Sequence, residues 1–167
     1  IHAAVEHVAA LGVTGVWICG AGTGGSLALG EGARNARVRG VAALAAQADF
    51  EDWARHPRRL LLHARQVGVI KDPEFPPAFD RWSAELRAVQ PLGAARDLAP
   101  RPLLVIHGDS DDLTPLEDGR AIAEAHGRAE LKVISGAGHE LRHDPRAVAV
   151  LLGWLSRQQI SDSVPPS

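Results

Sequence analysis

The chain has 167 residues, of which 46% are hydrophobic and 23% are charged, values typical of one globular domain with a sizeable core. Its net charge of −2 gives no electrostatic reason to expect nucleic acid or an anionic membrane as a partner, and no apolar run approaches the ~20 residues of a membrane span. The single cysteine, Cys19, excludes an internal disulfide. We therefore expect a soluble, cytoplasmic protein, with no indication of its oligomeric state.

Apolar strand-like runs alternate with helix-like segments along the chain. We expect helices over residues 2–10, 26–32 and 115–125 and from 145 onward, and strands over 13–19, 38–46, 102–107 and 131–135. The run 13–19 is almost wholly apolar, which predicts a strand buried on both faces. Such alternation predicts an α/β fold, a parallel sheet flanked by helices. We expect one domain over residues 1–160 and a disordered tail over 161–167.

The segment 50–97 differs from its surroundings in being rich in Arg, Pro and Trp. Pro57 suits the first turn of a helix that runs to about residue 67, and three prolines over 71–77 predict a loop. Phe79, Trp82, Leu86 and Val89 then follow amphipathic helical spacing. We interpret 50–97 as a small helical lid inserted into the domain.

The loops that follow three expected strands carry the residues that could take part in catalysis or ligand binding. Open parallel sheets place ligand sites at such loops. The first loop is the glycine turn 20–25 between a strand and a helix, the second is 108–112 with three aspartates, and the third is 136–139, which ends in His139. The glycine turn matches G-x-G-x-x-G by letter, and its setting also suits a nucleophile elbow.

The blocks 16–29, 102–115 and 133–154 together resemble the α/β-hydrolase superfamily, and serine aminopeptidase-like and small esterase-like members are the nearest relatives. The resemblance implies an α/β-hydrolase fold and cleavage of esters, amides or peptides. In the family pattern His-Gly-x-x-Asp, residues 107–111 place the catalytic acid at Asp111, and in Gly-x-Gly-His, residues 136–139 place the base at His139. A histidine can accept a hydroxyl proton near neutral pH, and a carboxylate orients it and stabilises the imidazolium.

The nucleophile departs from the family pattern. Aligning Gly24-Gly25 and the helix start with the family places Gly22 where the serine belongs, and glycine cannot attack a carbonyl. Its backbone freedom nevertheless suits the strained turn. Thr23 would then donate a backbone N–H to the oxyanion, or would be an alternative nucleophile if the elbow is shifted by one residue, whereas Ser26 would be a packing residue.

The resemblance also implies structure upstream of this sequence. Family members carry several strands and an oxyanion-hole loop before the elbow strand, whereas residues 1–12 hold only a helix. The chain lacks methionine and starts at Ile1, so we interpret it as an amino-terminally truncated fragment. The strand 13–19 would then expose an edge that a neighbouring strand should cover.

Two other motifs suggest cofactors. A dinucleotide site needs an acidic residue at the end of the second strand, about 20 residues after the glycines, but 38–46 has none and Asp49 is late. Residues 139–143 match the zinc motif H-E-x-x-H, which requires a helix, although a loop is expected here and no third ligand is evident. We therefore expect neither cofactor nor metal.

These patterns predict a protein that keeps the Asp111–His139 pair but is weakly active or inactive as a serine hydrolase, with a small acyl substrate or ligand as its partner. Activity through Thr23 and a binding function without catalysis stay open as alternatives. In a binding domain Trp53, Phe79 and Trp82 of the lid would line the ligand pocket; alternatively, they form the packing core of the lid.

Overall fold

A computed structural model describes residues 1–66 and 68–162 of the chain. The chain divides into two compact units, the first formed by Ile1–Ala48 with the part that begins at Pro91, and the second by Asp49–Gln90. The insertion expected over 50–97 is therefore shorter at its carboxyl end, because the helix that begins at Pro91 packs with other helices of unit 1.

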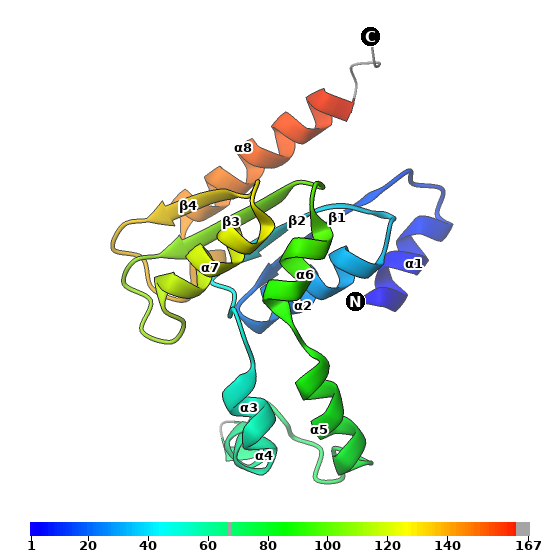
Figure 1. The fold of residues 1–167 in the computed structure, drawn as a ribbon, viewed down its shortest axis with the longest axis vertical. Coiled ribbons are helices and arrows are strands. Elements are labelled where there is room, and N and C mark those ends of the chain that lie inside the picture. The colour runs from blue at the N-terminus through cyan, green and yellow to red at the C-terminus, as the bar shows by residue number, and fades with distance from the viewer. Residues whose placement is uncertain (67, 163–167) are drawn as a thin grey trace. The chain divides into compact units, whose positions relative to one another are not determined.

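Unit 1 contains a parallel sheet of four strands in the order β1-β2-β3-β4 (Figure 1). These strands are β1 Val16–Ala21, β2 Val38–Leu44, β3 Leu103–Gly108 and β4 Glu130–Ile134. Neighbouring strands pair in parallel throughout, as in the register of Ala42 with Cys19 and Leu104. Parallel pairing brings the carboxyl ends of all strands to one edge of the sheet, so the loops that follow them share that edge.

Helices cover both faces of this sheet, as the sequence predicts. The helices of unit 1 are α1 His2–Ala10, α2 Thr23–Arg34, α6 Pro91–Leu98, α7 Leu116–His126 and α8 Pro145–Asp162, together with the 3-10 turn η1 Leu141–His143. Alternate residues of β2 and β3 point to opposite faces of the sheet and belong to two hydrophobic clusters. One cluster includes residues of α1, α2, α6 and α7, and the other includes residues of η1 and α8. The sequence predicts a disordered tail over 161–167, but residues 161 and 162 belong to α8. Residues 163–167 lie outside the described part of the chain.

The strand β1 is less buried than the sequence suggests. Its residues are partly buried, with Cys19 exposed, whereas every residue of β3 is buried. β1 lies at one end of the sheet and pairs only with β2 in the described part of the chain, so solvent reaches it from its free edge. The expectation of burial on both faces is therefore wrong for β1, although Trp17 packs edge-to-face on the buried Trp154, with ring centroids 5.2 Å apart.

Unit 2 is a small helical unit with little interior of its own. Its helices are α3 Glu51–Arg55, α4 Pro57–Gln66 and α5 Phe79–Ala88, and the proline-rich loop lies between the last two. Phe50 and Ser83 are its buried residues within 49–66 and 68–90. The sequence predicts α4 and α5 but misses α3, and the predicted end of α4 at residue 67 lies outside the described residues.

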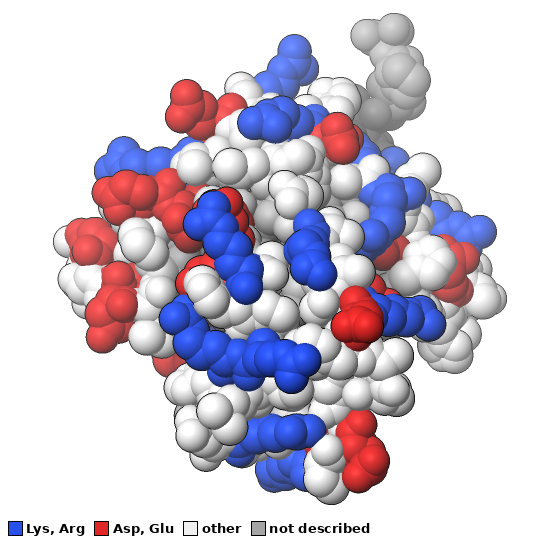
Figure 2. All heavy atoms as spheres, turned by 60° about the horizontal axis from the view of Figure 1, so that its bottom comes forward, with Lys and Arg blue, Asp and Glu red and all other residues white. Residues whose placement is uncertain are grey.

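Two features of the structure concern binding to nucleic acid and membranes: the charge of the surface and the length and hydropathy of the helices. Basic and acidic side chains both occur on the face shown in Figure 2. Among the described helices, none is both long enough and apolar enough to cross a lipid bilayer.

Candidate functional site

The glycine turn leads from the end of β1 into α2. Gly22 caps α2 with φ +54° and ψ −130°, a conformation that side chains rarely adopt. Its N–H donates to the carbonyl oxygen of Leu44 at 2.8 Å, and its carbonyl accepts from the N–H of Gly25 at 2.9 Å. These bonds hold residue 22 at the edge of the sheet where the strands end.

Two further glycines allow α2 to approach β1 closely. A Cβ atom on Gly20 would lie 2.2 Å from the carbonyl oxygen of Gly24, and one on Gly25 would lie 3.0 Å from the Cβ of Ala46. Strand–helix packing therefore accounts for the first and last glycines of G-x-G-x-x-G without a bound pyrophosphate.

An acid–base pair lies on the loops after β3 and β4. His139 Nδ1 is 3.0 Å from Asp111 Oδ2, and the Asp111 side chain is fully buried. Asp111 Oδ1 accepts from the N–H groups of Leu113 and Thr114, each at 2.9 Å. Burial alone would raise the pKa of Asp111, but the hydrogen bonds from Thr114, Leu113 and His139 outweigh it and hold the pKa below its ordinary value.

The imidazole of His139 also faces Gly22. An ideal Cβ at position 22 would lie 3.1 Å from His139 Nε2 and 3.6 Å from Cε1. Because Nδ1 donates to the Asp111 carboxylate, the neutral ring keeps its lone pair on Nε2, the atom that faces Gly22. Gly22, Asp111 and His139 thus meet at the carboxyl ends of β1, β3 and β4.

The loops that carry Asp111 and His139 are bound to each other. Asp109 Oδ1 accepts from the N–H of Gly136 at 2.6 Å, and the N–H of Ser110 donates to the carbonyl oxygen of Ala137 at 3.0 Å. The Gly136 N–H also holds the pKa of Asp109 below its ordinary value. Asp109 therefore joins the two loops, a role that the sequence does not indicate.

A second histidine, His107, lies close to the acid. Its side chain is fully buried, and Nε2 lies 3.0 Å from the carbonyl oxygen of Thr114 and 3.7 Å from Asp111 Oδ2. Nδ1 has no hydrogen-bond partner within the described residues, and a Cβ on Gly119 would lie only 2.6 Å from it. The sequence places His107 in the pattern His-Gly-x-x-Asp but does not indicate that its buried ring lies close to Asp111.

The hydroxyl groups beside the glycine turn are bonded to Gln47. Thr23 Oγ1 donates to Gln47 Oε1 at 3.2 Å, and Ser26 Oγ donates to the Gln47 carbonyl oxygen at 2.8 Å. Ser26 is buried, in agreement with a packing residue. The backbone N–H groups of Thr23 and Gly24 have no acceptor in the described part of the chain, as expected for the first turn of a helix.

The H-E-x-x-H motif does not lie on an α-helix. His139 is in a loop, whereas His143 ends the 3-10 turn and accepts from Arg142 Nε at 2.9 Å. Across residues 1–66 and 68–162, no three His, Cys, Asp or Glu side chains are grouped as a metal site would require. The arrangement that lets the motif bind zinc is therefore missing.

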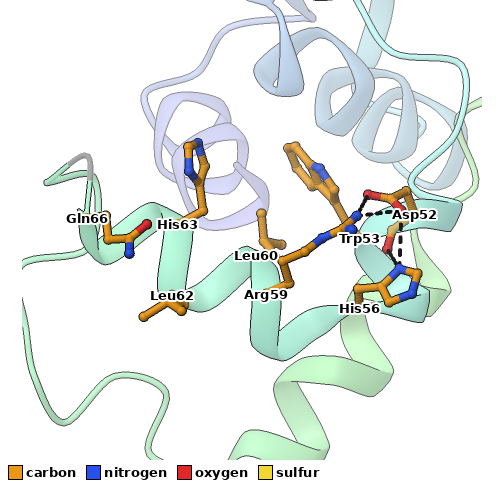
Figure 3. Close-up of a pocket in the computed structure, with 8 residues that line it drawn as sticks. All are labelled: Asp52, Trp53, His56, Arg59, Leu60, Leu62, His63 and Gln66. Atoms are coloured by element: carbon orange, nitrogen blue, oxygen red, sulfur yellow. Dashed lines mark hydrogen bonds and ion pairs between the residues drawn. The ribbon is translucent and has the colours of Figure 1, made fainter.

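The three aromatic residues proposed for the lid pocket have different surroundings. Trp53 lines a cavity of about 380 Å³ within unit 2, and Figure 3 shows it pointing to the same side as His63. The cavity is lined by Asp52, Trp53, His56, Arg59, Leu60, Leu62, His63 and Gln66. Phe79 and Trp82 instead pack on each other at 5.8 Å between centroids, which favours a packing role. Ligand binding by Trp53 stays a prediction.

Comparison with known proteins identifies the architecture. No family model matches the sequence. The esterase domain of a Rhodothermus marinus protein superposes with a TM-score of 0.69 at 20% identity, covering 94% of this chain and 67% of that one. An α/β hydrolase from the metagenome of Mar Chica lagoon sediments gives 0.63 at 18% identity, covering 92% and 67%. A hydrolase from Pseudomonas aeruginosa gives 0.60 at 22% identity, covering 92% and 69%. Likenesses at this identity establish the fold alone, and the chain has the α/β-hydrolase fold.

Proposed function

We propose that this chain carries an acyl-hydrolase type of site that lacks a side-chain nucleophile. His139 is the base, Asp111 orients it, and Gly22 occupies the position of the nucleophile. The ligand is a small ester or amide, by analogy with the esterase and hydrolases of the same fold. Without a hydroxyl or thiol beside His139 the protein forms no acyl-enzyme, so it is inactive or weakly active as a serine hydrolase.

One observation carries this proposal, the approach of Gly22 to the imidazole. A nucleophile and its base must lie within hydrogen-bond reach, about 2.6–3.2 Å. A Cβ at position 22 would already be 3.1 Å from His139 Nε2, so a side-chain oxygen there would reach that nitrogen. Thr23 is the alternative nucleophile, but its hydroxyl donates to Gln47.

A fluorophosphonate probe, which labels activated serines, tests the proposal on the full-length protein. We expect no labelling of the wild type or of Gly22→Ala, and labelling of Gly22→Ser that disappears when His139→Ala is added. Gly22→Ala is the matched control, because it carries the same backbone strain as Gly22→Ser without the hydroxyl. Thermal unfolding confirms that each variant is folded.

Two results contradict the proposal. A folded Gly22→Ser protein that stays unlabelled shows that residue 22 and His139 do not form a nucleophile–base pair. Labelling of the wild type that is lost in Thr23→Ala shows that Thr23 is the nucleophile. The cofactor alternatives predict thermal stabilisation by NAD(P) or stoichiometric zinc in the purified protein.

A further inference from the structure

We infer that a water molecule takes the place of the missing side chain, so that His139 acts on water directly and the site hydrolyses small, activated acyl esters without an acyl-enzyme. This inference rests on the proposed function, because it uses the same base. It goes beyond that function by assigning an activity to the site as it stands, with glycine at position 22 and no acyl-enzyme.

The base is arranged to accept a proton from solvent. His139 Nδ1 is bonded to Asp111, whereas Nε2 has no hydrogen-bond partner among the described residues. The His139 side chain is 23% exposed, so solvent reaches it, and the Asp111 side chain is fully buried. The low pKa of Asp111 keeps this carboxyl ionised, and a buried carboxylate stabilises the imidazolium that forms when Nε2 accepts a proton.

Gly22 leaves space at the point that this base faces. Any other residue at position 22 would bring its Cβ to 3.1 Å from Nε2, a distance at which a water oxygen bonded to that nitrogen would otherwise lie. A water hydrogen bond needs about 2.7–3.2 Å between oxygen and nitrogen. Glycine is thus the residue that lets a water molecule, rather than a side chain, bind to Nε2.

The start of α2 provides donors for the developing charge. The N–H groups of Thr23 and Gly24 have no acceptor within the described residues and follow Gly22 directly. The helix dipole adds a partial positive charge at this end. A substrate carbonyl oxygen bound to the Thr23 N–H would place its carbon beside the water on Nε2.

The reaction then proceeds without an acyl-enzyme. The water oxygen attacks the carbonyl carbon while one of its protons moves to His139 Nε2, and the carbonyl electron pair moves onto the oxygen held by Thr23 N–H. As that pair returns, the bond from carbon to the leaving alcohol oxygen breaks, and this oxygen takes the proton from Nε2. The products are one carboxylic acid and one alcohol, and the base regains its original state.

Activated esters are the substrate class because this site has a general base and backbone donors but no nucleophilic side chain. Positioned general bases contribute about 10²–10⁴-fold to a rate, far less than a complete hydrolase achieves. A good leaving group lowers the remaining barrier.

Hydrolysis of p-nitrophenyl acetate by the full-length protein tests the inference. We expect the wild-type rate above buffer to fall at least about 10²-fold in His139→Gln, which removes the base. Gly22→Ala should fall similarly, because its methyl group occupies the water position. The wild type should show no initial burst and no acetylated protein after acid quench.

Two control variants exclude other causes. His143→Gln removes an exposed histidine from the same segment and should retain the wild-type rate. Gly127→Ala strains another glycine, with φ +77° at the end of α7 and open space around its Cβ, and should also retain it.

The inference is overturned if His139→Gln or Gly22→Ala hydrolyses the ester as fast as the wild type, or if an acetyl group is found on His139 or another residue. The two proposals fail separately. If Gly22→Ser is labelled by fluorophosphonate but the wild-type rate does not depend on His139, only the water reaction is refuted. If folded Gly22→Ser is not labelled, the proposed function itself is wrong.

Discussion

Replacing Gly20 by alanine tests why the turn is rich in glycine. Gly20 lies in β1, and a Cβ there would be 2.2 Å from the Gly24 carbonyl oxygen and 2.7 Å from the Gly25 nitrogen. The three nearest atoms all belong to the backbone of α2, so no side-chain rotation relieves the overlap. Ordinary contact between a carbon and a carbonyl oxygen needs about 3.3–3.6 Å. The amino-terminal turn of α2 must therefore move away from β1 by roughly 1 Å.

The expected cost follows from this displacement. Overpacking of a well-packed region typically costs about 1–3 kcal/mol, and a clash with backbone belongs at the upper end of that range. Gly20→Ala should therefore lower the free energy of unfolding by about 3 kcal/mol. Gly24→Ala is the matched control, because its Cβ has nothing within 4 Å and it lies in a helix. It should leave stability unchanged or raise it by up to about 1 kcal/mol.

Urea denaturation followed by far-UV circular dichroism measures both variants. The midpoint should fall for Gly20→Ala at an unchanged slope, since the surface exposed on unfolding stays the same. Equal stability of the two variants would refute the packing explanation. The glycines would then need another reason, and close approach of a pyrophosphate would again be a serious alternative.

Three further predictions concern stability. Burial alone would raise the pKa of Glu31, but hydrogen bonds from Asn35 and His2 and nearby positive charge hold it below its ordinary value. Its stabilising contribution is thus present above pH about 4.3 and lost as pH falls further, so urea midpoints of Glu31→Gln should depend less on pH below about 4.3 than those of the wild type. Gly119→Ala places a Cβ 2.6 Å from His107 Nδ1, so it should lower the free energy of unfolding. In a double-mutant cycle, this loss should be smaller by about 0.5–3 kcal/mol when His107 is already replaced by alanine. Strict additivity of the two losses would refute the contact. Gly22→Ala and Gly22→Ser should each lower the free energy of unfolding by about 1–3 kcal/mol, because the new side chain is held in a strained backbone conformation. Thermal or urea unfolding measures this loss, and an unchanged free energy would show that the turn relaxes.

The sequence predicts the sheet better than the inserted unit, for a physical reason. β3 is identified by its continuous apolar run, because it is buried on both faces. The helix α6 was assigned to the insertion, since local spacing shows that Leu92, Ala95 and Leu98 share a face but not which body covers them. The helix α3 has five residues, too few for a helical period to stand out.

The candidate site shows the same division. The sequence places Asp111 and His139 in loops that follow strands, and parallel strands bring such loops to one edge of the sheet. Their roles as acid and base come from the resemblance alone and stay predictions. The bond from Gly136 to Asp109 and the approach of His107 Nε2 to Asp111 Oδ2 could not be predicted. The first joins two loops that lie 27 residues apart in sequence, and the second depends on how the loop after β3 turns back over its strand.

The backbone of the glycine turn explains why glycine suits position 22. At φ +54° and ψ −130° any side chain is strained, so a serine at position 22 would be held at a cost in stability. Glycine adopts the same dihedral angles with little strain, and the N–H of residue 22 still bonds to the Leu44 carbonyl oxygen. With glycine at position 22, the turn, the start of α2 and the His139–Asp111 pair are therefore all in place. The turn is accordingly evidence of fold, and the chemistry of the site depends on what occupies the space beside His139 Nε2.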